Sequence, residues 1–372
     1  MKALLLLLGL CVAFSNAAIQ CLDPNGNTVD WFFMLKLPNV VGDFKGYTYL
    51  YVDAVNSTTM IGDLSTASNN ALANTVTQIG LYGGNADASS VGYVLWNDQV
   101  YESVSGKAID HEKDSSGVYY AHSKATIAFD AETGFWLAHS APGFPFSHNI
   151  CPSSWTFPEA QSIYAQHFFC VSLTTSTLDT ISQSLLNYYS YIYDSNIPNS
   201  ISGISNIANF ASGKYTTGAS SWKFQSIGGV NFVAFGKHGD THSDIFEDYI
   251  APGLGSGLFV ESWCCGSFGD CCQQSYCQGA PIVDPSDPQK SKSTYDWNSI
   301  TIEKFSFASN LYYETKNNHA KFALSQSFGY VCPSDNNRAD TQRNRGGGSI
   351  CFQNQPLYDL LYNHITGFNT TC

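Results

Sequence analysis

Two short motifs, far apart in the chain, carry side chains that can act as acid, base and nucleophile. His122-Ser123-Lys124 and His319-Ala320-Lys321 each place an imidazole two positions before an ammonium group. In a strand, side chains at this spacing share one face. One imidazole could attack phosphorus, the other could protonate the leaving oxygen, and the ammonium groups could neutralise the remaining phosphate oxygens. The pair of motifs therefore indicates phosphoryl transfer that uses neither a metal ion nor another cofactor.

A third triplet, His111-Glu112-Lys113, has a different context. It runs into the turn sequence Asp114-Ser115-Ser116-Gly117, and no apolar strand follows to hold it rigid. We therefore interpret it as solvated surface. For either of the other triplets taken alone, a structural histidine beside a surface lysine is the competing interpretation, and the matched pair disfavours it.

An imidazole that acts as an acid must hold its proton, so activity should favour a pH near or below about 6.5.

Strand-like sequence follows both motifs and predicts how they are held. Alternation after the first motif directs Ala125, Ile127 and Phe129 toward a core, and it leaves Thr126, Ala128 and Asp130 on a polar face with His122 and Lys124. After the second motif, Phe322 and Leu324 point inward, and Ser325 lies on the side of His319 and Lys321.

The spacing of other elements suggests a diverged duplication. Residues 31–36 and 232–237 are apolar runs that each end in a lysine, which is typical of buried strands. Lys36 precedes His122 by 86 residues, and Lys237 precedes His319 by 82. Residues 92–96 and 126–129 also predict strands, and apolar residues recur at helical spacing after Thr177 and over 357–365. We expect an α/β fold of two α/β sandwich halves, 18–200 and 201–372, divided within the Ser-, Asn- and Gly-rich segment 194–221.

The N-terminus has the pattern of a secretory signal. Residues 1–17 combine a basic start, an apolar stretch and a small-residue cleavage site. No later apolar run reaches the roughly 18 to 20 residues of a membrane helix. We therefore expect a lysosomal or secreted protein that does not enter a membrane, with a signal anchor as the alternative. Asn56 and Asn369 begin glycosylation sequons, which agrees with secretion.

Net charge excludes one way of binding nucleic acid. The chain has 17 Lys and Arg against 30 Asp and Glu, a formal charge of -13. It therefore does not hold polyanions by bulk charge at neutral pH, and any phosphate site must be local. Arg338, Arg343 and Arg345, beside Gly346-Gly347-Gly348, form the candidate basic patch. An exposed loop closed by a disulfide is the alternative.

Cysteine usage agrees with an oxidising compartment. Of 12 cysteines, Cys11 lies in the signal, which leaves eleven for up to five disulfides and one thiol. Five cysteines, none with a histidine among them, crowd residues 264–277. We interpret them as a disulfide loop rather than a zinc site, because a secretory route favours oxidation.

Together these residues resemble a known family. The two His-x-Lys strands look like the paired signatures of the phospholipase D superfamily, and the surrounding sequence is similar to deoxyribonuclease II. The matching stretches are Val29-Asp30-Trp31-Phe32, Lys36-Leu37-Pro38, residues 134–142 and residues 345–351. The resemblance implies an acid endonuclease that cuts DNA to 3'-phosphate ends without divalent metal. It also implies two phospholipase D-like halves that share one active site across a pseudo-twofold axis.

The resemblance assigns roles to single residues. His122, Lys124, His319 and Lys321 would be the catalytic quartet, with His139 as a further histidine that supports activity. Asp130 would support His122, although it stands eight positions after that histidine where the superfamily has its Asp at seven. The second motif has Gln326 and Ser327 at these positions, which leaves Ser325 as the candidate support for His319. The family pattern implies disulfides Cys21–Cys170 and Cys332–Cys351, and it joins Cys372 to a cysteine of 264–277; Cys151 has no assignment. A catalytically silent binding or toxin-like homologue, and a phosphodiesterase of the same mechanism acting on RNA or phospholipid, are the alternative functions.

Overall fold

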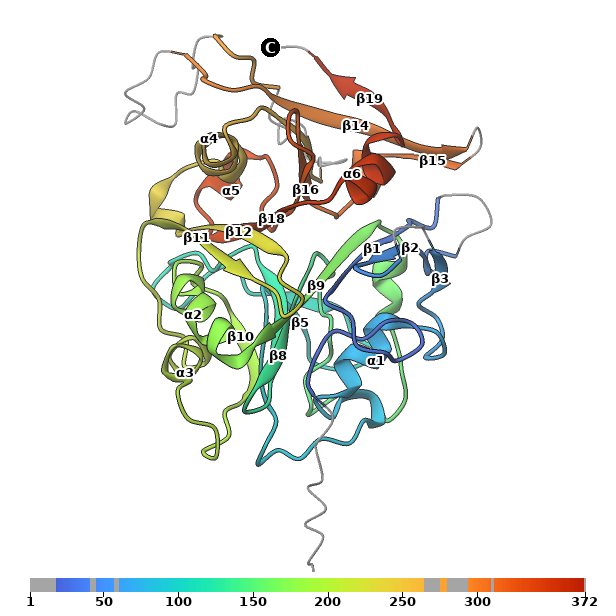
Figure 1. Cartoon of the computed structure of the whole chain (residues 1–372), viewed down its shortest axis with the longest axis vertical. Coiled ribbons are helices and arrows are strands. Elements are labelled where there is room, and N and C mark those ends of the chain that lie inside the picture. The colour runs from blue at the N-terminus through green and yellow to red at the C-terminus, as the bar shows by residue number, and fades with distance from the viewer. Residues whose placement is uncertain are drawn as a thin grey trace, which may run out of the picture.

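Two large sheets, lying one above the other in Figure 1, form the framework of the fold. The computed structural model describes residues 18–40, 45–56, 60–263, 275–279, 294–308 and 311–370. The predicted signal 1–17, four of the clustered cysteines and Cys372 lie outside these residues. The mixture of sheets and short helices agrees with the predicted α/β class.

The first sheet is antiparallel throughout and uses strands from the N-terminal part of the chain. Its order across the sheet is β10 (Ile192–Asn196), β4 (Gly92–Asn97), β7 (Lys124–Phe129), β8 (Thr133–His139), β9 (Gln166–Thr174), β1 (Trp31–Lys36), β2 (Thr48–Asp53) and β3 (Met60–Asp63). A small hairpin, β5 (Gln99–Tyr101) with β6 (Ala108–Asp110), stands apart from it.

The second sheet has nine strands and one parallel pair, β13 with β14. Its order is β11 (Ala219–Gln225), β12 (Asn231–Lys237), β18 (Gly347–Gln353), β17 (Tyr330–Pro333), β16 (Phe322–Ser325), β13 (Leu258–Glu261), β14 (Ser299–Ala308) and β15 (Leu311–Glu314). The last strand, β19 (Ile365–Asn369), pairs with β14.

Strand order is matched between the two sheets. The run β4-β7-β8-β9-β1 corresponds to β13-β16-β17-β18-β12, and every pair within both runs is antiparallel. The strands that follow the His-x-Lys motifs, β7 and β16, occupy equivalent places. So do β1 and β12, which end in Lys36 and Lys237. This order is what a duplication predicts, and the pseudo-twofold relation itself stays a prediction.

The two sheets pack on one another through a shared apolar core. Phe352 of β18 makes ring contacts with Trp31 of β1 and Phe169 of β9, each with centroids 5.1 Å apart. The expected polar face of β7 is not observed, because both of its faces are buried. Ala125, Ile127 and Phe129 face the shared core, whereas Ala128 packs in a second core on the side of α1 (Ala71–Thr77).

Short helices cover the sheets. They are α2 (Thr175–Leu185), α3 (Ser205–Ala211), α4 (Ala251–Leu254), α5 (Asp340–Arg343) and α6 (Gln355–Tyr362). The N-cap of α2 is Thr174, whose hydroxyl accepts the N–H of Thr177, so the helix starts earlier than predicted. The predicted C-terminal helix ends at Tyr362, and Ile365 belongs to β19. Within the described residues, no helix has the length and apolar character that a membrane crossing requires.

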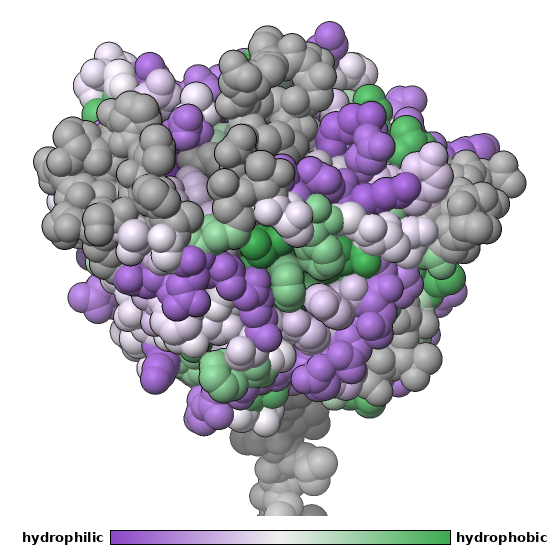
Figure 2. Space-filling model, turned by 90° about the horizontal axis from the view of Figure 1, so that it is seen from above, coloured by the Kyte–Doolittle hydropathy of each residue, from purple (hydrophilic) through white to green (hydrophobic). Residues whose placement is uncertain are grey.

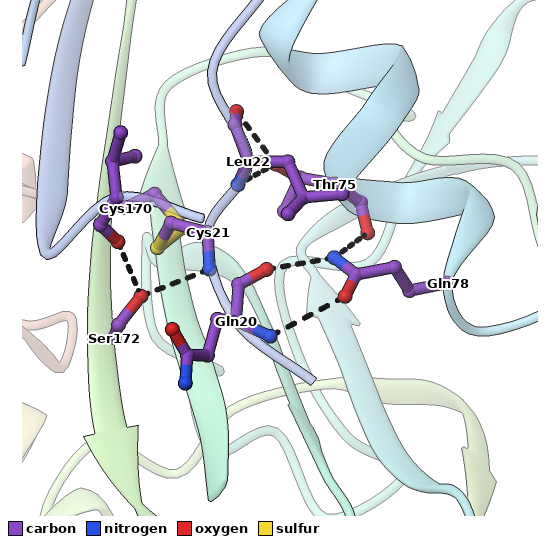
Figure 3. Close-up of a disulfide and its surroundings, with 8 residues drawn as sticks. Gln20, Cys21, Leu22, Thr75, Gln78, Cys170 and Ser172 are labelled. Atoms are coloured by element: carbon purple, nitrogen blue, oxygen red, sulfur yellow. Dashed lines mark hydrogen bonds between the residues drawn. A yellow bond between two sulfur atoms is a disulfide. The ribbon is translucent and has the colours of Figure 1, made fainter. Parts of the chain in front are cut away.

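Two disulfides agree with the expected pairs. Cys21–Cys170 joins the N-terminal segment to β9, and beside it Gln20 and Gln78 exchange two hydrogen bonds (Figure 3). Cys332–Cys351 joins β17 to β18. Cys277 is also disulfide-bonded, whereas Cys151 is a free thiol.

The end of the molecule that carries β14 and β19 has a mixed surface. Figure 2 shows hydrophilic residues over much of this face, with one band of apolar residues across its middle. Asn369 is half-buried in β19 at this end, and Asn56 is exposed after β2, so both sequon asparagines lie in the outer parts of the fold.

Candidate active site

Both His-x-Lys motifs line one cavity of about 560 Å³. His122 and Lys124 come from the start of β7, and His319 and Lys321 from the segment just before β16. Arg345, from the segment before β18, lines the same cavity. The remaining lining residues are Asp98, Gln99, Asp110, Glu112, Ser140, Pro142, Trp263, Asn337, Thr341 and Gln342. The fold thus brings four residues from distant parts of the sequence to a single space.

Residues from the second sheet hold His122. Its Nδ1 lies 2.9 Å from the carbonyl oxygen of Asp335, and its backbone N–H donates to Gly346 at 3.0 Å. The guanidinium of Arg345 donates to the carbonyls of Tyr120 and Ala121, just before the motif. A carbonyl only accepts, so a neutral His122 ring carries its proton on Nδ1, and Nε2 is the nitrogen left for a substrate.

Residues from the first sheet hold His319 and Lys321 in the same way. The N–H of His319 donates to Ala165 at 2.8 Å, and the N–H of Lys321 donates to Nδ1 of His167 at 3.2 Å. The ring of Tyr164 stacks on His319 with centroids 3.8 Å apart. Nε2 of His319 is buried and has no hydrogen-bond partner among the described residues, although the ring lines the cavity. Each motif is therefore positioned by segments of the opposite sheet.

Asp98 is the carboxylate that joins the two parts of the site. It forms ion pairs with Lys124 and, at 2.8 Å, with Arg345. All three side chains are at least 95% buried. Although burial opposes ionisation, the charges of Lys124 and Arg345 hold the pKa of Asp98 well below its usual value. The carboxylate therefore stays charged in acid and keeps Lys124 in place.

Burial and neighbouring cations shift the pKa values of the other groups. Burial, followed by the charge of Lys124, lowers the pKa of His122 well below its usual value. Burial and the charges of Lys321 and Lys124 do the same to the pKa of His319. Burial lowers the pKa of Lys321 to about 7, and it raises that of Asp335 to about 7. Below pH 7, therefore, Lys321 is a cation and the carboxyl of Asp335 is neutral.

His139 does not line the cavity. It ends β8, is 1% exposed, and accepts the N–H of Ala141 at 3.2 Å. Phe168 stacks on its ring. His167 on β9, which no sequence motif marks, contacts Lys321 directly. The next residue, Ser140, lines the cavity, so His139 lies close to the site. Burial, followed by the charges of Lys124 and His167, lowers the pKa of His139 well below its usual value.

Two of the predicted supporting residues are corrected by the structure. Asp130 follows the far end of β7, about 20 Å from Lys124 at 3.3 Å per residue. Its carboxylate accepts the N–H groups of Glu132, Thr133 and Ile19. Ser325 ends β16 and accepts the N–H of Tyr330. Each is too far along its strand to reach the cavity, because the motif lies at the other end.

The predicted arginine patch is likewise divided. Arg338 is 1% exposed, donates to Ser299 and Thr301, and lies over the ring of Tyr276. Arg343 is 3% exposed and donates to the Tyr276 hydroxyl. Neither lines the cavity. Of the three arginines, only Arg345 can therefore meet a phosphate there.

Three residues of the site, Asp98, Asp335 and Trp263, lie outside every sequence motif. Asp98 directly follows β4, and a polar residue at the end of a buried strand is the signal that could have marked it. Asp335 acts through its backbone carbonyl, which no residue type reveals. Trp263 lines the cavity and meets His319 edge-on at 4.8 Å. Its proximity to the motif appears only in the fold.

Comparison with known proteins finds one family. The model described as deoxyribonuclease II matches residues 20–371. Cell death-related nuclease 6 of Caenorhabditis elegans is 30% identical over 95% of this chain and 90% of its own length. Deoxyribonuclease-2 of the same organism is 30% identical over 96% of this chain and 95% of its own length. Deoxyribonuclease-2-alpha of Mus musculus is 27% identical over 90% of this chain and 89% of its own length.

Proposed function

This chain belongs to the deoxyribonuclease II family and is therefore a deoxyribonuclease, and we propose that it is an acid endonuclease that cuts DNA without a divalent metal ion. The observation that supports this proposal best is that both His-x-Lys motifs line one cavity. Lys124, Lys321 and Arg345 supply positive charge at the place where a phosphate would sit. A lysosomal or secreted location would supply the acid and the substrate.

In the proposed reaction, His122 is the nucleophile. Its Nε2 attacks phosphorus, a P–N bond forms, and the bond to the 5'-oxygen breaks. His319 gives its proton to that oxygen, which leaves as a 5'-hydroxyl. Water then attacks phosphorus, His319 takes a proton from it, and the P–N bond breaks. The product carries a 3'-phosphate, and both histidines return to their starting states.

The pKa shifts suit this division of roles. A low pKa keeps His122 neutral, as a nucleophile must be. His319 has to be protonated, which its lowered pKa restricts to acid, and the negative charge of a bound phosphate would raise that pKa. Neutral Asp335 would not repel the phosphate in acid.

The test is a product analysis. A labelled DNA oligonucleotide, a matched RNA and phosphatidylcholine are incubated with the protein at about pH 5 with excess chelator. We expect cleavage of DNA and fragments with 3'-phosphate ends. Loss of cutting under chelation, or fragments with 5'-phosphate ends, would reject the scheme. Faster hydrolysis of RNA or of the phospholipid would reject DNA as the main substrate.

A further inference from the structure

Two buried lysines outside the cavity have matched surroundings. Lys36 ends β1 and Lys237 ends β12, the equivalent strands of the two sheets, and both are fully buried. The ammonium of Lys36 donates to the carbonyls of Leu37, Gly46 and Ser162 at 2.8 to 3.2 Å. That of Lys237 donates to the carbonyls of Gln342, Arg343 and Arg345 at 2.5 to 3.3 Å. Each thus uses its three N–H donors on three backbone carbonyls.

Each lysine reaches at least one carbonyl in a segment that positions a motif. Ser162 lies two residues before Tyr164, which stacks on His319, and Ala165 accepts the N–H of that histidine. Arg345 precedes Gly346, whose carbonyl accepts the N–H of His122. Lys36 therefore holds the segment that contacts the second motif, and Lys237 holds the segment that contacts the first.

The register of the sheets repeats this correspondence. Lys36 lies opposite Gln166, the first residue of β9, and Lys237 lies opposite Gly347, the first residue of β18. A glycine also packs closely on the backbone of each segment. A Cβ on Gly46 would lie 2.0 Å from the carbonyl oxygen of Ser162, and one on Gly239 would lie 2.2 Å from that of Asn344. The backbone of each segment is therefore closely packed on the lysine side.

We propose that Lys36 and Lys237 are matched positioning residues of the nuclease site, each fixing a segment of its own sheet that holds the His-x-Lys motif of the other sheet. This inference rests on the proposed function for its effect on catalysis. A buried ammonium is costly to desolvate, and at both places its three hydrogen bonds to backbone carbonyls offset that cost while they tie the end of a strand to the neighbouring segment. Burial lowers the pKa of both lysines to about 7, and both are therefore cations at pH 5.

The test compares Lys36→Met and Lys237→Met with Lys223→Met, an exposed lysine on β11. Histidine ring resonances are followed by NMR across a pH titration. They are assigned with variants that each replace one histidine. We expect Lys237→Met to shift His122 with little effect on His319, and Lys36→Met to do the reverse. At pH 5 each variant should lower kcat on a DNA oligonucleotide by about 10- to 100-fold with little change in KM. Lys223→Met should change none of these.

Lys36→Gln and Lys237→Gln separate charge from hydrogen bonding. Glutamine is neutral but keeps two N–H donors, so its effects should fall between those of lysine and methionine. This matters for Lys36, whose charge itself contributes to lowering the pKa of His319. The glutamine variants also serve if a methionine variant does not fold. Shifts of both histidines by the same amount in every variant, or of neither, would overturn the inference. A wild-type protein that does not cut DNA would overturn the proposed function alone, because the NMR comparison does not need activity.

Discussion

Nδ1 of His122 lies 2.9 Å from the carbonyl oxygen of Asp335, a residue 213 positions further along the chain. The contact joins a strand of one sheet to a segment of the other, and it fixes which ring nitrogen faces the substrate. His319 is also held by the other sheet, because its backbone N–H donates to the carbonyl of Ala165. Neither motif is positioned by its own sheet alone, so the site forms only when both sheets are in place.

Removal of either motif histidine should abolish cleavage. His122→Ala deletes the proposed nucleophile, and His319→Ala deletes the proposed acid, so each should lower the rate at pH 5 by at least about a thousandfold. Because the two act in one reaction, the double variant should be no worse than the single ones. Initial rates on a labelled DNA oligonucleotide measure this. His111→Ala, in the third triplet, is the control and should keep most activity. If His122→Ala or His319→Ala keeps most of the cleavage activity, that histidine is not part of the mechanism.

Activity should rise as pH falls below 6.5. Burial and the nearby lysines lower the pKa values of both motif histidines, and a protonated His319 is needed for departure of the leaving group. Raising the pH removes this proton first, so the alkaline limb of kcat/KM, which reports the free enzyme, should have its midpoint below the ordinary pKa of histidine, about 6.5. A pH–rate profile at constant ionic strength tests it. A plateau that extends to pH 7.5 would contradict the assignment of His319 as the acid.

Substitution of Lys321 should move the alkaline limb of the pH–rate profile to higher pH. Its charge is the first contribution, after burial, to the lowered pKa of His319, so Lys321→Met should raise that pKa and displace the alkaline limb to higher pH. The maximal rate should fall at the same time, by about 100-fold or more, because one phosphate-neutralising cation is lost. Profiles of wild type and variant give both quantities. A lower rate with an unmoved limb would show that Lys321 does not act on His319.

Part of the fold was predictable because local sequence decides it. The apolar runs of β1, β4, β7 and β12 are buried strands, as expected, since such runs satisfy both faces of a covered sheet. Burial of both faces of β7 also explains why the supporting role predicted for Asp130 was wrong. Alternation identifies which residues share a face, but with both faces of β7 buried it does not say which end of the strand meets a partner.

The two His-x-Lys motifs, which line one cavity, could be singled out from the sequence because their residue types and spacing occur twice. Asp98 and the carbonyl of Asp335 could not be singled out, because the ion pair of Asp98 with Arg345 and the contact of Asp335 with His122 both depend on how the sheets meet. Arg338 and Arg343 were misassigned for a related reason. Clustering in sequence predicts a patch only if the side chains point outward, and these two satisfy buried polar groups instead.

Loss of the Cys21–Cys170 disulfide should destabilise the protein without removing activity. Cys21→Ala with Cys170→Ala opens a link of 149 residues, and Cys332→Ala with Cys351→Ala opens one of 19. Chain entropy makes the longer link worth about 2 kcal/mol more, within a usual range of about 2 to 5 kcal/mol. Urea unfolding of both double variants gives the difference, and cleavage at 25 °C checks the site. A larger loss from the shorter link would contradict the entropic account.

Asp98→Asn and Asp130→Asn should have opposite consequences for activity. The first removes the anion between Lys124 and Arg345 and leaves two buried cations without it, which costs about 3 to 5 kcal/mol of folding free energy and frees Lys124 to move. We expect a lower melting temperature and a loss of cleavage of about 100-fold or more at pH 5. Asp130→Asn weakens a turn at the far end of β7, so it should reduce stability slightly and leave kcat within about twofold. Thermal unfolding and initial rates on the same oligonucleotide measure both variants. A strong loss of activity in Asp130→Asn with Asp98→Asn unaffected would return the supporting role to Asp130.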